Sequence, residues 1–142
     1  MGRCYNSAVI PAPRNEVWDR IKDFHDLSWA AGVIDKVEPI GAKAGTEVGA
    51  ARLLNDAFCE TLRSLDEDNF TFSYSIDDGP GPVARDAVSN YLGTVRLLPV
   101  SDNNTTFIEW VSRFDAAADH EVEAFCNPIY AALIGVLKAG FA

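Results

Sequence analysis

The chain has 142 residues, of which 12 are lysine or arginine and 21 are aspartate or glutamate, so its net charge is −9. This length predicts one domain over residues 1–142, and a hydrophobic share of 48% is typical of a folded globular protein. Because an acidic surface repels phosphate groups, the charge argues against nucleic acid and anionic membranes as partners.

The cysteines, histidines and apolar runs argue against a disulfide framework, a metal site and a membrane span. Cys4, Cys59 and Cys126 are odd in number and irregularly spaced, which predicts reduced thiols in a cytoplasmic protein rather than a disulfide framework. His25 and His120 are isolated, so we expect no metal site, and no motif indicates a cofactor. No apolar run approaches the length of a membrane span, so we expect no stable insertion into a bilayer.

The N-terminal segment predicts a strand followed by a helix. Residues 7–10 read as a short strand, which Pro11 and Pro13 end because proline has no backbone N–H to donate. Apolar residues then recur with helical spacing. They are Val17, Trp18, Ile21 and Phe24.

Six further strands are predicted in the middle of the chain, where apolar runs are separated by turn residues. They cover residues 36–40, 47–54, 58–65, 70–76, 87–98 and 105–114. Residues 77–82 must form a loop, since they contain two glycines and two prolines. Strands that follow one another through such turns predict an antiparallel meander.

A long helix is predicted to close the chain, beginning near Asp119, which can cap it. Pro128 lies inside this helix and should bend it. The apolar residues at helical spacing form one stripe. They are Val122, Phe125, Ile129, Leu133 and Val136.

Several short motifs, in this order, carry a family resemblance. After the strand, proline corner and helix come Leu27-Ser-Trp29, Val48-Gly-Ala-Ala-Arg52, Glu60-Thr-Leu-x-x-Leu-Asp66, Val88-Ser-Asn-Tyr91 and Thr106-Phe-Ile-Glu-Trp110. Together they resemble the SRPBCC superfamily (START and birch pollen allergen-like helix-grip proteins), in its polyketide cyclase/dehydrase-like branch. The resemblance implies an α+β helix-grip fold, in which a curved antiparallel sheet wraps a long C-terminal helix around an internal cavity.

Arg52 and Glu60 are the charged residues expected to face that cavity. Side chains alternate between the faces of a strand, so Arg52 shares a face with Leu54, and Glu60 shares one with Leu62. A reversal around Asp56 would place Arg52 and Glu60 nearly opposite each other. They form either a buried pair that orients a polar group of the ligand or a partly solvated pair at the sheet edge. The resemblance favours the cavity, because it implies a glutamate at this position in a water-mediated polar network.

The same alternation places aromatic side chains on the inner face of the later strands. Tyr74 shares a face with Ile76, and Tyr91 shares one with Gly93, which leaves room at the wall. Taken singly, each aromatic residue is better explained by core packing, whereas the set favours a pocket with a few polar groups. The residues expected to bind the ligand are Arg52, Glu60, Tyr74, Ile76, Tyr91, Trp110, Phe125 and Ile129.

Two functions fit these features. The first is the binding of a hydrophobic or amphipathic small molecule, such as a lipid, an isoprenoid or a polyketide-like aromatic. The alternative is a polyketide cyclase or dehydratase-type enzyme, in which Glu60 acts as acid or base and Tyr91 or Arg52 stabilises an enolate. Binding is favoured, because Arg52 would hold Glu60 ionised and weakly basic. We expect a monomer or weak homodimer, in which the N-terminal part of the long helix and the loop 77–86 gate the cavity.

Overall fold

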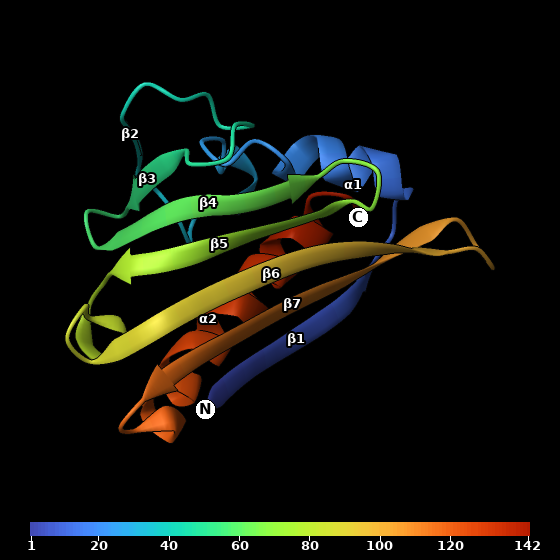
Figure 1. The fold of residues 1–142 in the computed structure, drawn as a ribbon. Coiled ribbons are helices and arrows are strands. Elements are labelled where there is room, and N and C mark those ends of the chain that lie inside the picture. Colours follow the sequence, from blue (N-terminus) through green and yellow to red (C-terminus); the bar gives the residue numbers. More distant parts are fainter.

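The computed structural model describes all residues from 1 to 142. Seven strands form one antiparallel sheet, in the order β1-β7-β6-β5-β4-β3-β2, so that the first strand pairs with the last (Figure 1). The elements are β1 (Gly2–Ile10), α1 (Arg14–Ile21), η1 (Ser28–Ala30), β2 (Val37–Ile40), β3 (Ala51–Leu54), β4 (Phe58–Asp66), β5 (Thr71–Asp78), η2 (Gly81–Val83), β6 (Val88–Val100), β7 (Thr105–Ala116) and α2 (Asp119–Ala139).

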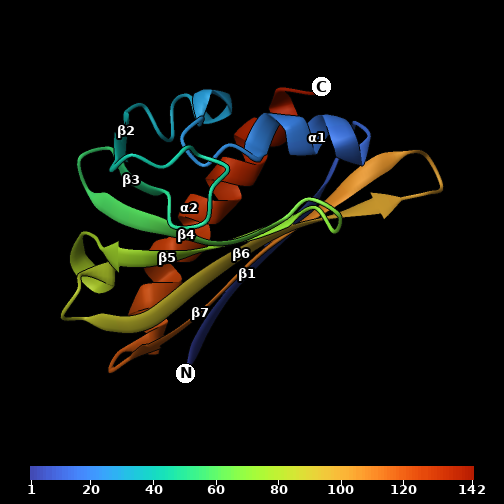
Figure 2. The same cartoon turned by 45° about the horizontal axis from the view of Figure 1, so that its top comes forward.

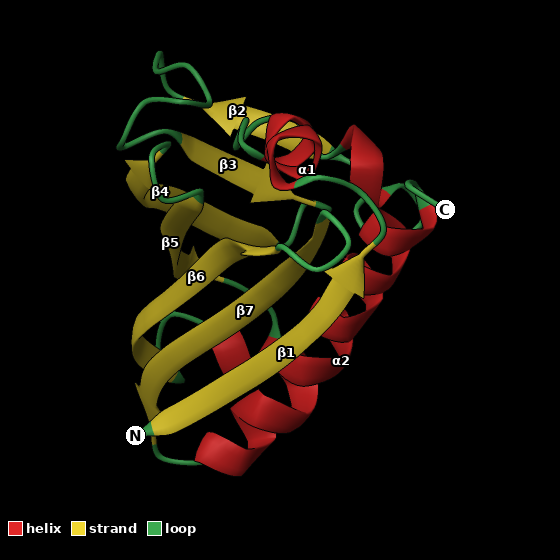
Figure 3. Ribbon diagram, turned by 90° about the vertical axis from the view of Figure 1, so that its right-hand side faces the viewer, coloured by secondary structure: helices red, strands yellow, loops and turns green.

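The long helix α2 packs against the face toward which the sheet curves (Figure 3). Its C-terminal end lies beside α1 (Figure 2), where Arg20 Nη1 donates a hydrogen bond of 3.0 Å to the Gly140 carbonyl oxygen. Farther along the helix, Asn6 Nδ2 of β1 donates one of 2.9 Å to Asn127 Oδ1. A curved antiparallel sheet around a C-terminal helix is the helix-grip fold, as the sequence predicts.

Two strands start more than one residue away from the position that the pattern indicates. β1 begins at Gly2, because its first half pairs with the end of β7 and the missing side chain of Gly2 leaves space for the Phe114 ring. β3 begins only at Ala51. Before it, the Glu47 side chain accepts a hydrogen bond of 3.0 Å from the Ala44 N–H, which closes a turn in place of the predicted strand residues.

The predicted inner stripe of α2 is wrong by one residue over most of its length. Phe125, Ile129 and Val136 are only half-buried. The helical period admits two neighbouring stripes, and the chain buries the other one, with Cys126 and Tyr130 in place of Phe125 and Ile129. The buried face consists of Val122, Cys126, Tyr130, Leu133, Ile134 and Leu137.

By length and composition alone, α2 could cross a membrane, which differs from the prediction made from apolar runs. The core helix of a soluble protein passes the same test, and α2 occupies that position, with one face against β1 and β7. The helix continues on both sides of Pro128, so the bend at this residue stays a prediction.

Candidate ligand-binding site

The site begins with an ion pair across β3 and β4. Asn55 and Asp56 have positive φ angles of 52° and 56° and reverse the chain between the two strands. This turn sets a register in which Arg52 lies directly opposite Glu60. Both residues are 5% exposed, so they form the buried pair and not a solvated pair at the sheet edge.

Arg52 is held in place from three sides. Its Nε and Nη2 donate hydrogen bonds of 3.0 and 2.7 Å to the same oxygen, Glu60 Oε1. Its Nη1 donates one of 2.9 Å to the carbonyl oxygen of Phe24, and Cζ lies 3.6 Å from the centroid of the Phe24 ring. The stacked, hydrogen-bonded guanidinium is therefore fixed in one orientation.

Burial raises the pKa of Glu60 above its ordinary value, because the ionised form loses water, and the charge and hydrogen bonds of Arg52 oppose this change. The folded carboxyl therefore keeps its proton to a higher pH than the unfolded one. Between the two pKa values the native state binds more protons, so the contribution of this group to stability falls as pH rises.

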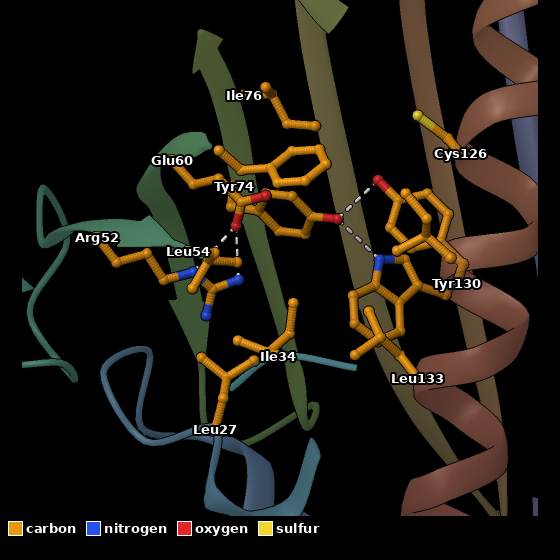
Figure 4. A pocket seen from close by; sticks show the side chains of 13 residues that line it. Leu27, Ile34, Arg52, Leu54, Glu60, Tyr74, Ile76, Cys126, Tyr130 and Leu133 are labelled. Carbon is orange, nitrogen blue, oxygen red and sulfur yellow. Dashed lines mark hydrogen bonds and ion pairs between the residues drawn. The ribbon is translucent and has the colours of Figure 1, made fainter. Parts of the chain in front are cut away.

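A network of aromatic polar groups crosses the core from the sheet to α2 (Figure 4). Trp110 Nε1 donates a hydrogen bond of 2.9 Å to the Tyr74 hydroxyl, which donates one of 2.9 Å to the Tyr130 hydroxyl. Tyr130 also shares a short hydrogen bond with Tyr91. Burial raises the pKa of all three phenols, so they stay protonated and bind one another as neutral groups.

We expect Tyr130→Phe to lower the free energy of unfolding by about 1–3 kcal/mol, because it leaves the buried hydroxyls of Tyr74 and Tyr91 without their shared partner. Denaturant titration measures the change. The matched control is Tyr5→Phe, which removes a hydroxyl that donates to Glu109 at the surface and should have almost no effect. Equal effects of the two changes would contradict the assigned role of the network.

A cavity lies between the ion pair and α2, with a volume of about 40 Å³. Eleven of its 13 lining residues are hydrophobic, and Arg52 and Glu60 are the charged ones. The lining consists of Leu27, Ile34, Arg52, Leu54, Phe58, Glu60, Tyr74, Ile76, Trp110, Cys126, Ile129, Tyr130 and Leu133. This volume is far below the roughly 300–1,000 Å³ of pockets that hold drug-sized molecules.

Two of the eight predicted site residues lie outside this lining, namely Tyr91 and Phe125. Tyr91 stacks on the Phe114 ring, with centroids 5.4 Å apart. Phe125 stacks on Phe58, with centroids 6.3 Å apart. Six predicted residues line the cavity: Arg52, Glu60, Tyr74, Ile76, Trp110 and Ile129.

Seven lining residues were not among the predicted site residues. Two of them could have been predicted from the sequence pattern: Leu54 shares a strand face with Arg52, and Leu133 lies on the predicted apolar stripe of the helix. The remainder come from an irregular segment, a strand start and the unpredicted helix face. They are Leu27, Ile34, Phe58, Cys126 and Tyr130.

The predicted loop 77–86 starts two residues later, because β5 extends to Asp78, and none of these residues lines the cavity. It is anchored instead, since Val83 is fully buried and Asp78 Oδ1 accepts hydrogen bonds from the backbone N–H groups of Gly79 and Arg85. Leu27 and Ile34 cover the cavity in place of this loop, because both line the cavity and the neighbouring surface pocket. They separate the cavity from a surface pocket of about 280 Å³.

Residues 1–141 match the family model for polyketide cyclase/dehydrase and lipid transport proteins. The chain belongs to this family. A solved protein from Nitrosospira multiformis is 41% identical, with a TM-score of 0.96 over 99% of this chain and 96% of that one. No curated protein has a significant sequence match.

More distant structures share the fold. XoxI from Bacillus cereus is 24% identical, with a TM-score of 0.82 over 99% of this chain and 96% of that one. Norcoclaurine synthase from Thalictrum flavum is 16% identical, with a TM-score of 0.71 over 96% and 84% of the two chains. Together with the match to the family model over residues 1–141, this shared fold confirms the resemblance to the SRPBCC superfamily. The family description covers both catalysis and transport, so the choice between them depends on the cavity.

Proposed function

We propose that this protein binds a hydrophobic or amphipathic small molecule, such as a lipid, an isoprenoid or a polyketide-like aromatic, in the cavity beneath α2. The observation that carries the proposal is one buried ion pair in an otherwise apolar wall. Apolar walls supply affinity through burial of ligand surface, at roughly 25 cal/mol per Å². The single polar group fixes the orientation of the ligand.

Binding requires the cavity to open. Leu27 and Ile34 separate it from a surface pocket of about 280 Å³. Displacement of these two side chains would join the two spaces into one of the size that small ligands occupy. Both lie in the irregular stretch around η1, which is held by turns rather than by the sheet ladder. The ligand would therefore enter between η1 and β2.

The alternative function, a cyclase or dehydratase-type enzyme, is supported by the raised pKa of Glu60. A carboxyl group with a pKa closer to neutrality is a better general acid or base than an ordinary one. Arg52 would then stabilise the enolate, because Tyr91 lies outside the cavity lining. The ion pair opposes this role, since it favours the ionised, weakly basic carboxylate.

Leu133→Trp should abolish ligand binding, because the larger ring fills the cavity that Leu133 lines. Leu92→Trp is the matched control, since Leu92 is 42% exposed and lies on a strand outside that lining. The fluorescence of N-phenyl-1-naphthylamine, a neutral apolar probe, measures binding, and circular dichroism verifies the fold. Native mass spectrometry of protein purified from its own host would reveal a retained ligand. If the wild type neither retains a ligand nor binds the probe saturably, the proposed function is wrong.

A further inference from the structure

The ion pair retains unused hydrogen-bonding capacity on Glu60. Both bonds from Arg52 end on Oε1, at 3.0 and 2.7 Å, and no protein donor reaches Oε2. The side-chain polar atoms that are completely buried and have no hydrogen-bond partner are Trp18 Nε1, Trp29 Nε1 and Ser112 Oγ. Glu60 Oε2 has no partner but is not one of these atoms, so it is not completely buried. Because Glu60 lines the cavity, this oxygen is an acceptor available to a bound molecule.

Arg52 has unused capacity of the opposite kind. A guanidinium has five N–H groups, and three of them bind Glu60 Oε1 and the Phe24 carbonyl oxygen. One N–H on each of Nη1 and Nη2 is left without a protein acceptor. The stacking of Arg52 on the Phe24 ring prevents these groups from turning elsewhere. The pair therefore offers a donor beside an acceptor.

The other polar groups in the cavity wall are already occupied. The Tyr74 hydroxyl accepts a hydrogen bond from Trp110 and donates one to Tyr130, and the Tyr130 hydroxyl also binds Tyr91. Their rings form the wall, but their hydroxyls point toward one another (Figure 4). A ligand consequently meets one polar anchor, Arg52 with Glu60, and otherwise carbon and the Cys126 thiol.

The charges of the pair decide which head group fits this anchor. The charges of Arg52 and Glu60 cancel each other. A ligand carboxylate would therefore add a buried negative charge without a partner, and a ligand ammonium would add a buried positive one, and both are strongly unfavourable. A hydroxyl adds no charge, can donate to Glu60 Oε2 and can accept from an Arg52 N–H. On the basis of the proposed function, we propose that the cavity selects ligands with one neutral, hydrogen-bond-donating head, an alcohol or a phenol, over carboxylates.

Three probes of equal chain length test this selectivity at pH 8: dodecan-1-ol, methyl dodecanoate and dodecanoate. The affinity of each compound for the wild-type protein is measured by its displacement of N-phenyl-1-naphthylamine. We expect the alcohol to bind at least tenfold more tightly than the ester, which has no donor, and than the carboxylate, which adds a charge. Comparable affinities for all three, or tightest binding of dodecanoate, would overturn the selectivity and leave the proposed function intact. Failure of all three to displace the bound probe would overturn the selectivity, whereas failure of the wild-type protein to bind the probe or retain a ligand would overturn the proposed function.

Glu60→Gln removes the negative charge of the pair and keeps the size of the side chain. With the carboxylate gone, the positive charge of Arg52 is uncompensated, so dodecanoate should gain at least tenfold in affinity and bind more tightly than dodecan-1-ol. Leu92→Gln, on the outer face of the sheet, is a control for the introduced amide and should keep the wild-type order. An unchanged order in a folded Glu60→Gln protein would overturn the proposal. If this variant does not fold, the wild-type series alone decides.

Discussion

Replacing Glu60 by leucine is expected to lower the free energy of unfolding by about 3–5 kcal/mol, and replacing Arg52 by methionine should cost a similar amount at pH 8. Both side chains are only 7% exposed, so each change leaves the other charge buried without its partner. The double variant Arg52→Met/Glu60→Leu removes both charges with similar volumes, and it should recover most of the loss. Denaturant titrations of the four proteins measure the coupling.

The two single variants should differ in their response to pH. Glu60 can take up a proton, whereas arginine stays charged. In Arg52→Met, burial raises the pKa of Glu60 without the opposing charge of Arg52. Between the unfolded and folded pKa values the native state binds more protons, so stability rises as pH falls. Arg52→Met should therefore recover stability relative to the wild type as pH approaches 4.5, whereas Glu60→Leu should not.

The matched control for this cycle is the exposed pair of Lys36 with Asp56, whose Nζ and Oδ1 are 2.8 Å apart with 53% and 62% of the side chains exposed. Asp56→Asn suits the positive φ of this position, because asparagine also tolerates the left-handed conformation. It should leave the unfolding free energy nearly unchanged, since exposed pairs contribute little. A coupling near zero between Arg52 and Glu60 would show that burial gives them no special role.

Gly93→Ala and Gly135→Ala are expected to change stability in opposite directions. A Cβ on Gly93 would overlap the Tyr74 ring, which is 1% exposed and held through its hydroxyl by Trp110 and Tyr130. We therefore expect a loss of about 1–3 kcal/mol. A Cβ on Gly135 in α2 meets no atom within 4 Å, and alanine favours the helix by about 0.5–1 kcal/mol.

Thermal and denaturant unfolding of the two alanine variants measure these changes. Since the substitution is the same, the difference in sign isolates the close approach of Tyr74 to Gly93. A Gly93→Ala protein as stable as the wild type would mean that Tyr74 can move aside. The cavity wall would then be softer than the hydroxyl network indicates, and the position would be open to ligand-induced rearrangement.

That Arg52 and Glu60 lie opposite each other could be predicted from the sequence because it depends on backbone geometry alone. Geometry left open whether the pair is buried or solvated, and the family resemblance favoured the buried one. Alternation assigns the faces of Arg52 and Glu60, and the short turn at Asn55 and Asp56 fixes the register. The inner face of α2 could not be chosen in this way. Whether Tyr130 turns inward depends on hydroxyl partners that come from strands β5 and β6, distant in the sequence.

The size of the cavity also could not be predicted from the sequence pattern. Alternation tells which side chains face inward, but not how much space they leave between them. Gly93 indicates room at the wall, yet that room is taken by the Tyr74 ring. Leu27 and Ile34 belong to a segment without helical or strand periodicity, so no pattern predicted that they close the cavity.

The pairing of the first strand with the last has a consequence for how the chain folds. Residues 2–10 of β1 pair with residues 106–114 of β7, so the partners are separated by roughly 100 residues, and such long-range pairing is typical of domains that fold in milliseconds to seconds. During synthesis on the ribosome, β1 has no neighbour in the sheet until β7 has emerged. The arrival of the C-terminal part of the chain therefore determines when the sheet is completed.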